Sequence, residues 1–313
     1  MHRFIIKRLF MMIPIVIGVS LIIFVLIDLI PGDPGSSLLG AGARQEDIDM
    51  LNEELGHNRP LIQRYGLYMY NAIFRLDLGL SYATKRPVFT EVVNRLPVSL
   101  TVAFNAVLFS IVFGVPLGVL SAVKQNTLFD RFPTGFALLI SSQPAFLIGL
   151  VLMLIFSLWL GLLPATGITS WRSYIMPMIA FGLPNGGRQL RFTRSSMLET
   201  IRQDYVRTAK GKGAPAQVVI WKHAMKNALL PVITLAGQSF GILIGGAVAT
   251  ETLFGLPGLG TFIVSGIQQK DVPVVTGGIM ILAVLFSIVI LLVDISYAFV
   301  DPRIRAKYSG SKA

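Results

Sequence analysis

The residues best suited to a chemical task lie in a polar, basic stretch between two apolar ones. Its first part reads Asp204-Tyr205-Val206-Arg207-Thr208-Ala209-Lys210-Gly211-Lys212-Gly213, and its second part runs from Lys222 to Pro231. An alanine such as Ala209 allows close helix packing, Gly213 permits a turn, and Arg207 can pair with acidic groups on another surface. The stretch therefore predicts a cytosolic surface that a soluble protein contacts. The alternative is that its charges only enforce topology and touch lipid head groups.

The rest of the chain has the composition of a membrane protein. Of its 313 residues, 53% are hydrophobic and only 14% are charged, whereas about 25% are charged in soluble domains. The formal net charge of +11 is explained by membrane topology without nucleic acid. The chain has no cysteine, and its three histidines are far apart in sequence. We therefore predict no disulfide, no catalytic thiolate and no metal site.

Six apolar stretches are long enough, or nearly so, to cross a bilayer as helices. They are Leu9–Ile30, Leu100–Val123, Gly135–Leu163, Tyr174–Arg191, Leu229–Thr250 and Val274–Val300. The fourth is the weakest because prolines and glycines interrupt it. The first follows three basic residues, as a signal sequence would, but it is too long for one and lacks a cleavage pattern. We interpret it as an uncleaved span.

The distribution of Lys and Arg predicts that both termini are cytosolic. Nine basic residues lie between Arg188 and Asn227, whereas two loops expected on the opposite face hold only Arg172 and Lys270. The segment 31–98 falls on that opposite face, and apolar residues at helical spacing in it predict a small external cap of short helices. The predicted organisation is 1–30 (N-terminal residues and first span), 31–98 (cap), 99–300 (five-helix core containing the cytosolic segment 192–228) and 301–313 (cytosolic tail).

Within 192–228 the sequence predicts two helices joined by a turn. The spacing of Ser196-Met197-Leu198-Glu199 is typical of a capping box, so one helix is expected to begin there and to end at about Lys212. Pro215 suits the first turn of a second helix that reaches Pro231. Three apolar residues then share one face of the second helix: Val218, Trp221 and Met225.

These motifs resemble those of a known family, the membrane subunits of ATP-binding-cassette importers in the dipeptide, oligopeptide, glutathione and nickel permease group. The resemblance rests on Tyr205-Val206-Arg207-Thr208-Ala209 with Gly213, and on His223-Ala224 with Asn227-Ala228-Leu229 and Pro231. Further matching motifs are Ile30–Pro34, Thr193–Glu199, Glu251–Gly260, Asp271–Val275 and Asp301–Arg305. The first two residues of the superfamily's Glu-Ala-Ala pattern and its glycine-to-proline gap differ here, as they do in the peptide subgroup.

The resemblance implies an all-α integral membrane protein with six transmembrane helices and the type I importer permease fold. It also implies a bacterial inner-membrane location, two cytosolic ATPases that bind ATP and Mg, an external substrate-binding protein and a second permease subunit, expected to be a paralogue. The chain has no phosphate-binding Gly-x-x-x-x-Gly-Lys-Ser/Thr loop, so we expect no ATP hydrolysis, catalytic residue or cofactor in it. Peptides are the expected cargo, with glutathione, nickel chelates and haem as alternatives.

Three groups of residues are candidates for functional roles. Contact with the ATPases is predicted for Tyr205, Arg207, Thr208, Ala209, Gly213, Trp221 and Pro231. Polar residues are costly against lipid, so a translocation path or interhelical hydrogen bonding is predicted for Asn105, Gln143, Gln238 and Asp294. The resemblance implies an external gate or binding-protein contact, with an ordinary re-entrant turn as the alternative, at Glu251, Phe254, Pro257, Gly258 and Gly260.

Two other classes of protein are weighed against the importer subunit. A secondary carrier usually shows internal repeats and ionisable groups in the middle of its spans, and no convincing repeat occurs here. A membrane enzyme needs a constellation such as paired acids or a serine with a base, and none stands out. The expected mechanism is alternating access, in which closure of the ATPases moves the Tyr205–Trp221 segment as a lever.

Overall fold

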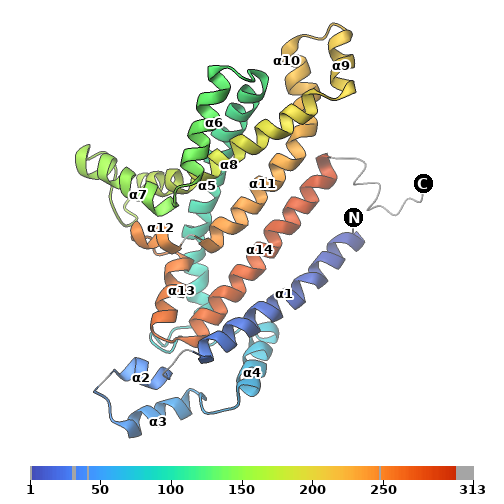
Figure 1. Cartoon of the computed structure of the whole chain (residues 1–313). Helices are drawn as coiled ribbons and strands as arrows, with labels where there is room; N and C mark the ends of the chain where they lie inside the picture. The colour runs from blue at the N-terminus through green and yellow to red at the C-terminus, as the bar shows by residue number, and fades with distance from the viewer. Residues whose placement is uncertain (1, 30–32, 41, 247, 301–313) are drawn as a thin grey trace. The chain divides into compact units, whose positions relative to one another are not determined.

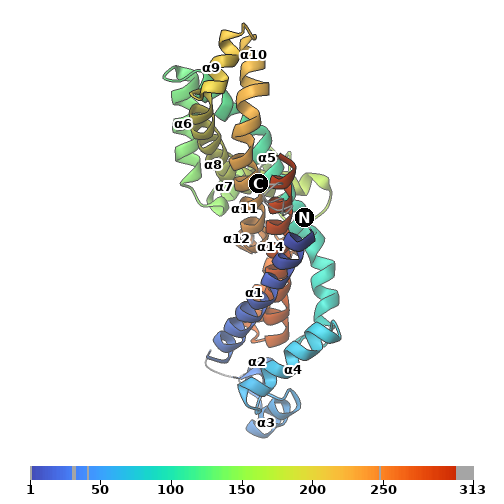
Figure 2. The ribbon, with the colours of Figure 1, turned by 90° about the vertical axis from the view of Figure 1, so that its right-hand side faces the viewer.

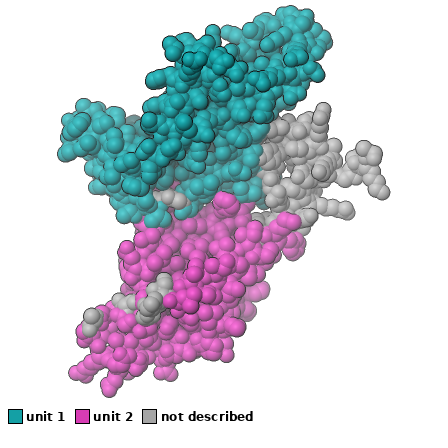
Figure 3. Space-filling model, viewed as in Figure 1, with its two compact units in different colours: residues 1, 100–256, 288–313 teal, residues 2–99, 257–287 magenta. Residues whose placement is uncertain are grey.

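The computed structural model describes residues 2–29, 33–40, 42–246 and 248–300. All regular elements of these residues are helices, apart from one isolated bridge between Leu80 and Pro87 (Figure 1). The chain divides into two compact units, which Figure 3 colours separately. Unit 1 comprises residues 1, 100–256 and 288–313, and unit 2 comprises residues 2–99 and 257–287.

Unit 2 combines one long helix with short ones and with parts of two others. Its elements are α1 (His2–Leu29), α2 (Pro34–Leu39), α3 (Gln45–Glu54), α4 (Leu61–Phe74), the beginning of α5 (Val88–Val123), α13 (Leu259–Gln268) and the beginning of α14 (Val272–Val300). Short helices thus occur within 31–98, as the periodicity of the sequence predicts. The side-chain oxygen of Asp33 caps α2 by accepting a hydrogen bond from the Ser36 N–H at 2.8 Å.

The core of unit 2 lies where apolar side chains of α4, α5, α13 and α14 meet. Its buried members are Met69, Ala72, Leu78, Val88, Val92, Leu259, Phe262, Ile263, Val274, Val275 and Met280. Tyr65 of α4 packs edge-on against Phe24 of α1, with ring centroids 5.6 Å apart. The buried carboxylate of Asp271 accepts hydrogen bonds from the Ser81 hydroxyl at 2.6 Å and the Ala83 N–H at 3.2 Å. These bonds fix the loop before α5 against the start of α14.

Unit 1 contains the remaining helices. They are the rest of α5, α6 (Leu128–Ser141), α7 (Ala145–Leu152), the π-helix η1 (Met153–Trp159), the 3-10 helix η2 (Trp171–Tyr174), α8 (Ile175–Ile201), α9 (Asp204–Gly211), α10 (Ala216–Val218), the π-helix η3 (Val219–Ala224), α11 (Met225–Gly246), α12 (Val248–Leu253) and the end of α14. Helix α8 packs against α6, α7 and α11.

Helices α5 and α8 approach each other closely through small residues. A Cβ at Gly114 or Gly118 of α5 would lie 2.6 Å from the carbonyl oxygen of Gly186 or Leu190 of α8, respectively. Two glycines four residues apart are the small-xxx-small pattern with which membrane helices pack. The glycines that interrupt the apolar pattern of the fourth predicted span therefore belong to the packing surface of an unbroken α8.

The stretch Gly135–Leu163, predicted as one span, is not one helix. The chain forms α6 and then α7 with η1, and the two parts are bent by 102° relative to each other. Pro144 has extended backbone angles and precedes α7, and a proline disfavours helical geometry in the residue before it. Among the described residues, Val88–Val123 and Val272–Val293 qualify as spans by length and composition. The number rises to four if two bent pairs are each counted as one span: Leu128–Ser141 with Ala145–Trp159, and Ala216–Leu229 with Pro231–Gly245. The number six stays a prediction.

Candidate functional site

Helix α9 packs one narrow apolar face against the other helices of unit 1 and leaves its remaining residues exposed. Val206 is fully buried and Ala209 is half-buried, whereas Tyr205 is 41% exposed and Arg207 and Lys210 are exposed. A helix of eight residues is too short to be stable alone in water. Packing of its apolar face must therefore hold it in place.

Gly213 ends this segment in a left-handed backbone conformation, with φ +78°. The Gly213 N–H donates to the Lys210 carbonyl at 3.0 Å, and the Ala214 N–H donates to the Ala209 carbonyl at 3.3 Å. These two bonds form a Schellman motif, which satisfies carbonyl groups at the end of a helix. A Cβ at Gly213 would meet no atom within 4 Å. The glycine is thus required by its backbone angles and not by a close neighbour.

The buried face of α9 joins an apolar cluster built from the long helices of unit 1. Its buried members are Val115, Val119 and Ala122 of α5, Met197 of α8, Val206 of α9, Val219 and Ala224 of η3, and Met225, Ala228 and Val232 of α11. Figures 1 and 2 both show α9 beside α10. Because close-packed side chains transmit displacement, a movement of α9 would act on α5, α8 and α11 together.

The first helix predicted for this segment does not begin at Ser196, and that prediction is wrong. Helix α8 continues through this residue to Ile201. The Ser196 hydroxyl donates to the Ala228 carbonyl of α11 at 3.3 Å, so the serine joins two helices and caps neither. Helix α9 is a separate element that follows Gln203, whose backbone is extended.

The second predicted helix follows Pro215, which is its N-cap, and runs through η3 into α11. The π-helical stretch Val219–Ala224 has wider turns than an α-helix and shifts the register of the side chains. Met225 is consequently buried, whereas Val218 is 38% and Trp221 is 55% exposed. The prediction that these three side chains share one face is wrong, because it assumed α-helical geometry throughout.

Two hydrogen bonds fix the polar side chains of α9. The Asn227 side-chain amide of α11 donates to the Tyr205 hydroxyl at 2.7 Å, which ties α9 to α11. The Thr208 hydroxyl donates to the Asp204 carbonyl at 2.9 Å within α9 itself. Tyr205 and Thr208 are thus engaged in holding the helix, while Arg207 extends from its exposed side.

An ion pair next to the apolar cluster was not predicted from the sequence. Arg194 of α8 donates from Nε and Nη2 to the two carboxylate oxygens of Asp130 at 2.6 and 2.8 Å. The same carboxylate accepts from the Ser121 hydroxyl at 2.5 Å and the Asn126 N–H at 2.9 Å. This bidentate, charge-assisted arrangement joins α5, α6 and α8. Asp130 and Arg194 are 64 residues apart in the sequence, so no local sequence pattern could predict this ion pair.

Pro231, the last of the residues predicted to contact the ATPases, lies inside α11. The helix bends by 49° between the part that ends at Leu229 and the part that begins at Pro231. Proline lacks the N–H for a helical hydrogen bond and its ring clashes with the preceding turn. The bend therefore separates the α9-contacting part of α11 from the rest of the helix.

The candidate lining residues occupy different surroundings. Asn105 is half-buried on α5, Gln143 lies between α6 and α7, and Gln238 is exposed on α11. The side chain of Asp294 lies outside the described ones. An apolar cavity of about 390 Å³ in unit 1, between α5, α11 and the end of α14, is not lined by the three candidates whose side chains are described, Asn105, Gln143 and Gln238. Their role stays a prediction.

The candidate gate residues begin in α12 and the turn after it. Glu251 and Phe254 are 0% and 1% exposed. The Phe254 carbonyl accepts a hydrogen bond from the Gly167 N–H at 2.9 Å, and Gly255 turns the chain with φ +58°. Further along, Pro257 is exposed, and two buried residues complete the set: Gly258 and Gly260. A gating role for this segment stays a prediction.

These features define a class of protein. It is an all-helical membrane protein with a short, exposed, basic helix that packs on the ends of its long apolar helices. Among the described residues, no group of three or more His, Asp or Glu side chains is placed to hold a metal ion.

Comparison with known proteins identifies the family. Residues 114–306 match the binding-protein-dependent transport system inner membrane component, and residues 1–103 match the N-terminal part of the corresponding membrane component. The chain is 36% identical over 307 residues to the glutathione transport system permease protein GsiC of Escherichia coli K12, covering 98% of this chain and 100% of that protein. GsiC of Shigella boydii serotype 4 is 35% identical over the same length. This chain therefore belongs to the family of binding-protein-dependent transport system inner membrane components, the permease subunits of ABC importers.

A solved structure agrees with this assignment at the level of the fold. The MetNI methionine ABC transporter in an inward-facing conformation matches with a TM-score of 0.56 at 18% identity, over 67% of this chain and 96% of that one. The predicted all-α membrane fold and permease family are thus confirmed. The chain is a transport subunit of a bacterial inner-membrane system.

Proposed function

We propose that this chain forms half of the translocation pathway of an importer and that two separate ATPase subunits drive it through α9. The observation that carries the proposal is the division of α9 into two faces. One face, with Val206 and Ala209, packs on the ends of three long helices, and the other exposes Arg207 and Lys210. Such a helix is suited to receive a push on one side and to transmit it on the other.

The charge of this region favours an acidic docking surface. Lys212 and Lys222 are exposed in addition to the basic residues of α9. Their combined field attracts an acidic partner over about 8 Å at physiological ionic strength. The chain carries no phosphate-binding loop of its own, so ATP and Mg would bind to the partner.

The proposed mechanism is alternating access. Closure of the two ATPases displaces α9, and the apolar cluster passes the displacement to α5, α8 and α11. The bend of 49° at Pro231 gives α11 a place where its first part can move relative to the second. Cargo enters from a docked external binding protein and leaves toward the cytosol after hydrolysis. The second permease subunit is proposed to be a paralogue.

The proposed cargo is a small peptide. Glutathione, itself a tripeptide, is the first compound to test because relatives named as glutathione permeases are 36% identical over 98% of this chain. Other di- and oligopeptides follow from the wider family, and nickel chelates and haem are the alternatives. Uptake of labelled glutathione, a dipeptide and a hydrophobic tripeptide by vesicles that contain the purified complex would separate these cargoes.

The lever role is tested by two matched glycine substitutions. Gly213→Ala forces a non-glycine residue into φ +78°, whereas Gly211→Ala places the same methyl group in open space two residues earlier. We expect Gly213→Ala to lower both uptake and substrate-stimulated ATPase activity, and Gly211→Ala to leave them unchanged. Intact transport after replacement of Gly213 by alanine, and also by a bulkier residue, would exclude the lever.

Mass spectrometry of proteins that co-purify from native cells tests the assembly itself. Two ATPases, a second permease and a binding protein are expected with the wild type, and loss of the ATPases is expected with a combined Arg207→Gln and Gly213→Val variant. Recovery of the chain without any nucleotide-binding partner would favour an autonomous carrier instead.

A further inference from the structure

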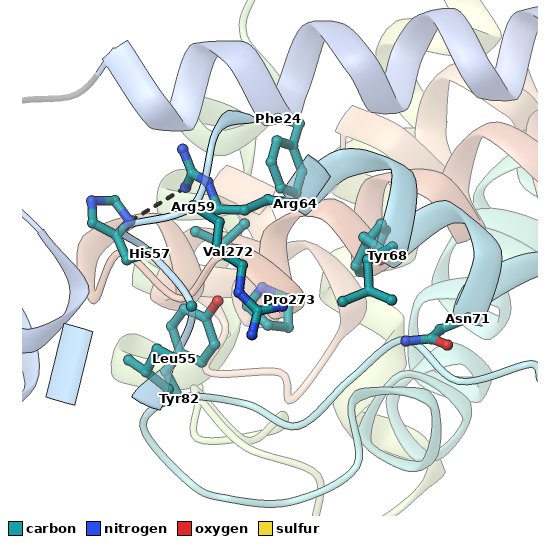
Figure 4. Close-up of a pocket in the computed structure, with 12 residues that line it drawn as sticks. Phe24, Leu55, His57, Arg59, Arg64, Tyr68, Asn71, Tyr82, Val272 and Pro273 are labelled. Carbon is teal, nitrogen blue, oxygen red and sulfur yellow. Dashed lines mark hydrogen bonds between the residues drawn. The ribbon is translucent and has the colours of Figure 1, made fainter. Parts of the chain in front are cut away.

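A pocket in unit 2 is rich in hydrogen-bond donors. It has a volume of about 190 Å³ and lies between α1, α4, the turn after α3 and the start of α14 (Figure 4). Its polar lining consists of His57, Arg59, Arg64, Tyr68, Asn71 and Tyr82. Among the described residues, no carboxylate lines it. Guanidinium groups only donate hydrogen bonds, and phenol and amide groups can donate them.

Arg64 is held rigidly at one wall of this pocket. Its Nη2 donates to the Asp28 carboxylate at 2.5 Å, and its Nη1 lies 3.3 Å from Nδ1 of His57. Since a guanidinium has no acceptor, Nδ1 of His57 must accept this bond. Figure 4 draws the bond as a dashed line between the two side chains. The Nε atom of Arg64 is buried and has no partner among the described residues.

Tyr68 adds a second unmatched donor. Its hydroxyl is buried without a hydrogen-bond partner among the described residues, which is costly for a polar group. Burial raises the pKa of Tyr68 above its ordinary value and raises the pKa of Tyr82 to about 12. Both phenols are therefore protonated at neutral pH and able to donate. Arg59 is exposed and lines the pocket, and it is not a partner in the ion pairs between described residues.

We propose that this pocket binds a carboxylate group carried on a small apolar body. The planar guanidinium of Arg59 matches carboxylate geometry. Arg64 offers its Nε, because its Nη1 and Nη2 atoms already contact His57 and Asp28, and the buried Tyr68 hydroxyl supplies a further donor. Phe24, Leu67 and Val272 provide the apolar wall. The volume is below the ~300–1,000 Å³ of sites that enclose a drug-sized ligand, so the pocket fits one terminal residue or one acidic side chain. The proposal is independent of the cargo and of the coupling role of α9.

Direct binding to the full-length protein in lipid nanodiscs tests the proposal and distinguishes two sources of the carboxylate. The probes are N-acetylalanine, which models a peptide C-terminus, N-acetylglutamic acid α-amide, which models an acidic side chain, and N-acetylalanine amide, which has no charge. Titrations followed by saturation-transfer NMR should give saturable binding of at least one carboxylate and none of the neutral amide. Equal binding of all three probes, or of none, would overturn the proposal.

Three variants locate the binding. Tyr68→Phe removes one hydroxyl and should weaken binding about tenfold or more, as expected for a hydrogen bond to a charged group. Arg59→Gln should weaken it severalfold, because its guanidinium is exposed and screened. Arg44→Gln removes an exposed arginine of the same unit that does not line the pocket, and it should have no effect.

Stability measurements separate binding from folding in these variants. Tyr68→Phe removes a hydroxyl that has no partner among the described residues, so the apparent Tm of the unliganded protein should stay the same or rise. Unchanged Kd values in both Tyr68→Phe and Arg59→Gln, with folding intact, would place the carboxylate elsewhere and overturn the proposal.

Discussion

Two short helices of unit 1 are followed by a glycine in the left-handed conformation: Gly213 after α9 has φ +78°, and Gly255 after α12 has φ +58°. A Cβ at Gly213 would meet no atom within 4 Å, whereas a Cβ at Gly255 would lie 3.5 Å from Gly167 and from Thr166. The side chains around Gly213 are mostly exposed, but Phe254 beside Gly255 is 1% exposed.

The difference teaches that turn chemistry and exposure have separate causes. The left-handed glycine depends on local backbone geometry, whereas exposure depends on which distant segments pack against the turn. The turn after α12 is packed inside unit 1, where Phe254 is buried and its carbonyl accepts a hydrogen bond from the Gly167 N–H. The residues around the α9 turn are mostly exposed and form the surface that we propose for ATPase docking, so substitutions there are expected to affect assembly more than folding.

The largest expected contrast concerns the aromatic residues of the two regions. Phe254→Ala should lower the free energy of unfolding by about 3–5 kcal/mol because it leaves a cavity in a packed site. Trp221→Ala removes a side chain that is 55% exposed, so the free energy of unfolding should change by less than about 0.5 kcal/mol. Apparent unfolding temperatures of the two purified variants measure the contrast. Similar losses would show that Trp221 is also part of the core.

Replacing either left-handed glycine by alanine should lower folding stability equally, but the two substitutions should differ in their effect on transport. Gly213→Ala and Gly255→Ala should each destabilise the chain by about 1–2 kcal/mol, since alanine is strained in the left-handed region. Transport and ATPase stimulation, compared at equal amounts of folded protein, should fall further in Gly213→Ala. Parallel losses in both variants would remove the functional distinction between the turns.

A smaller effect is expected at the bond between α9 and α11. Tyr205→Phe removes the hydroxyl that accepts a hydrogen bond from the Asn227 side-chain amide. This substitution should lower the free energy of unfolding by about 0.5–1 kcal/mol. Because both residues are exposed, water can replace the lost bond. Faster hydrogen exchange of the α9 amides, with no change in α12, would locate the effect. Unaltered exchange in α9 would indicate that the apolar face alone holds this helix.

The smallest effect on stability is expected for Arg207→Gln. The residue is exposed, so the free energy of unfolding should stay within about 0.5 kcal/mol of the wild type. Retention of the ATPases during purification should nevertheless fall, and the loss should be more evident at low salt, where charge pairing is least screened. Arg44→Gln, in unit 2, serves as the control. Equal ATPase retention in both variants would contradict a docking role for Arg207.

Features that depend on short stretches of chain could be predicted from the sequence. The turn at Gly213, the short helices of 31–98 and the apolar stretches all follow from residue type and spacing. Helix boundaries were less predictable: Ser196-Met197-Leu198-Glu199 has the spacing of a helix start, but the Ser196 hydroxyl bonds to Ala228 of another helix. The π-helical stretch Val219–Ala224 likewise displaced the face expected from α-helical periodicity.

The sequence by itself determined that this is a membrane protein, that it is helical and to which family it belongs. Hydropathy, the length of the apolar stretches and the order of the motifs are properties of the chain alone. Only the tertiary structure decided that α9 packs on three helices, that Asp130 pairs with Arg194 and that the donors around Tyr68 share one pocket. The physical reason is that such contacts join residues distant in sequence, and packing between helices selects them.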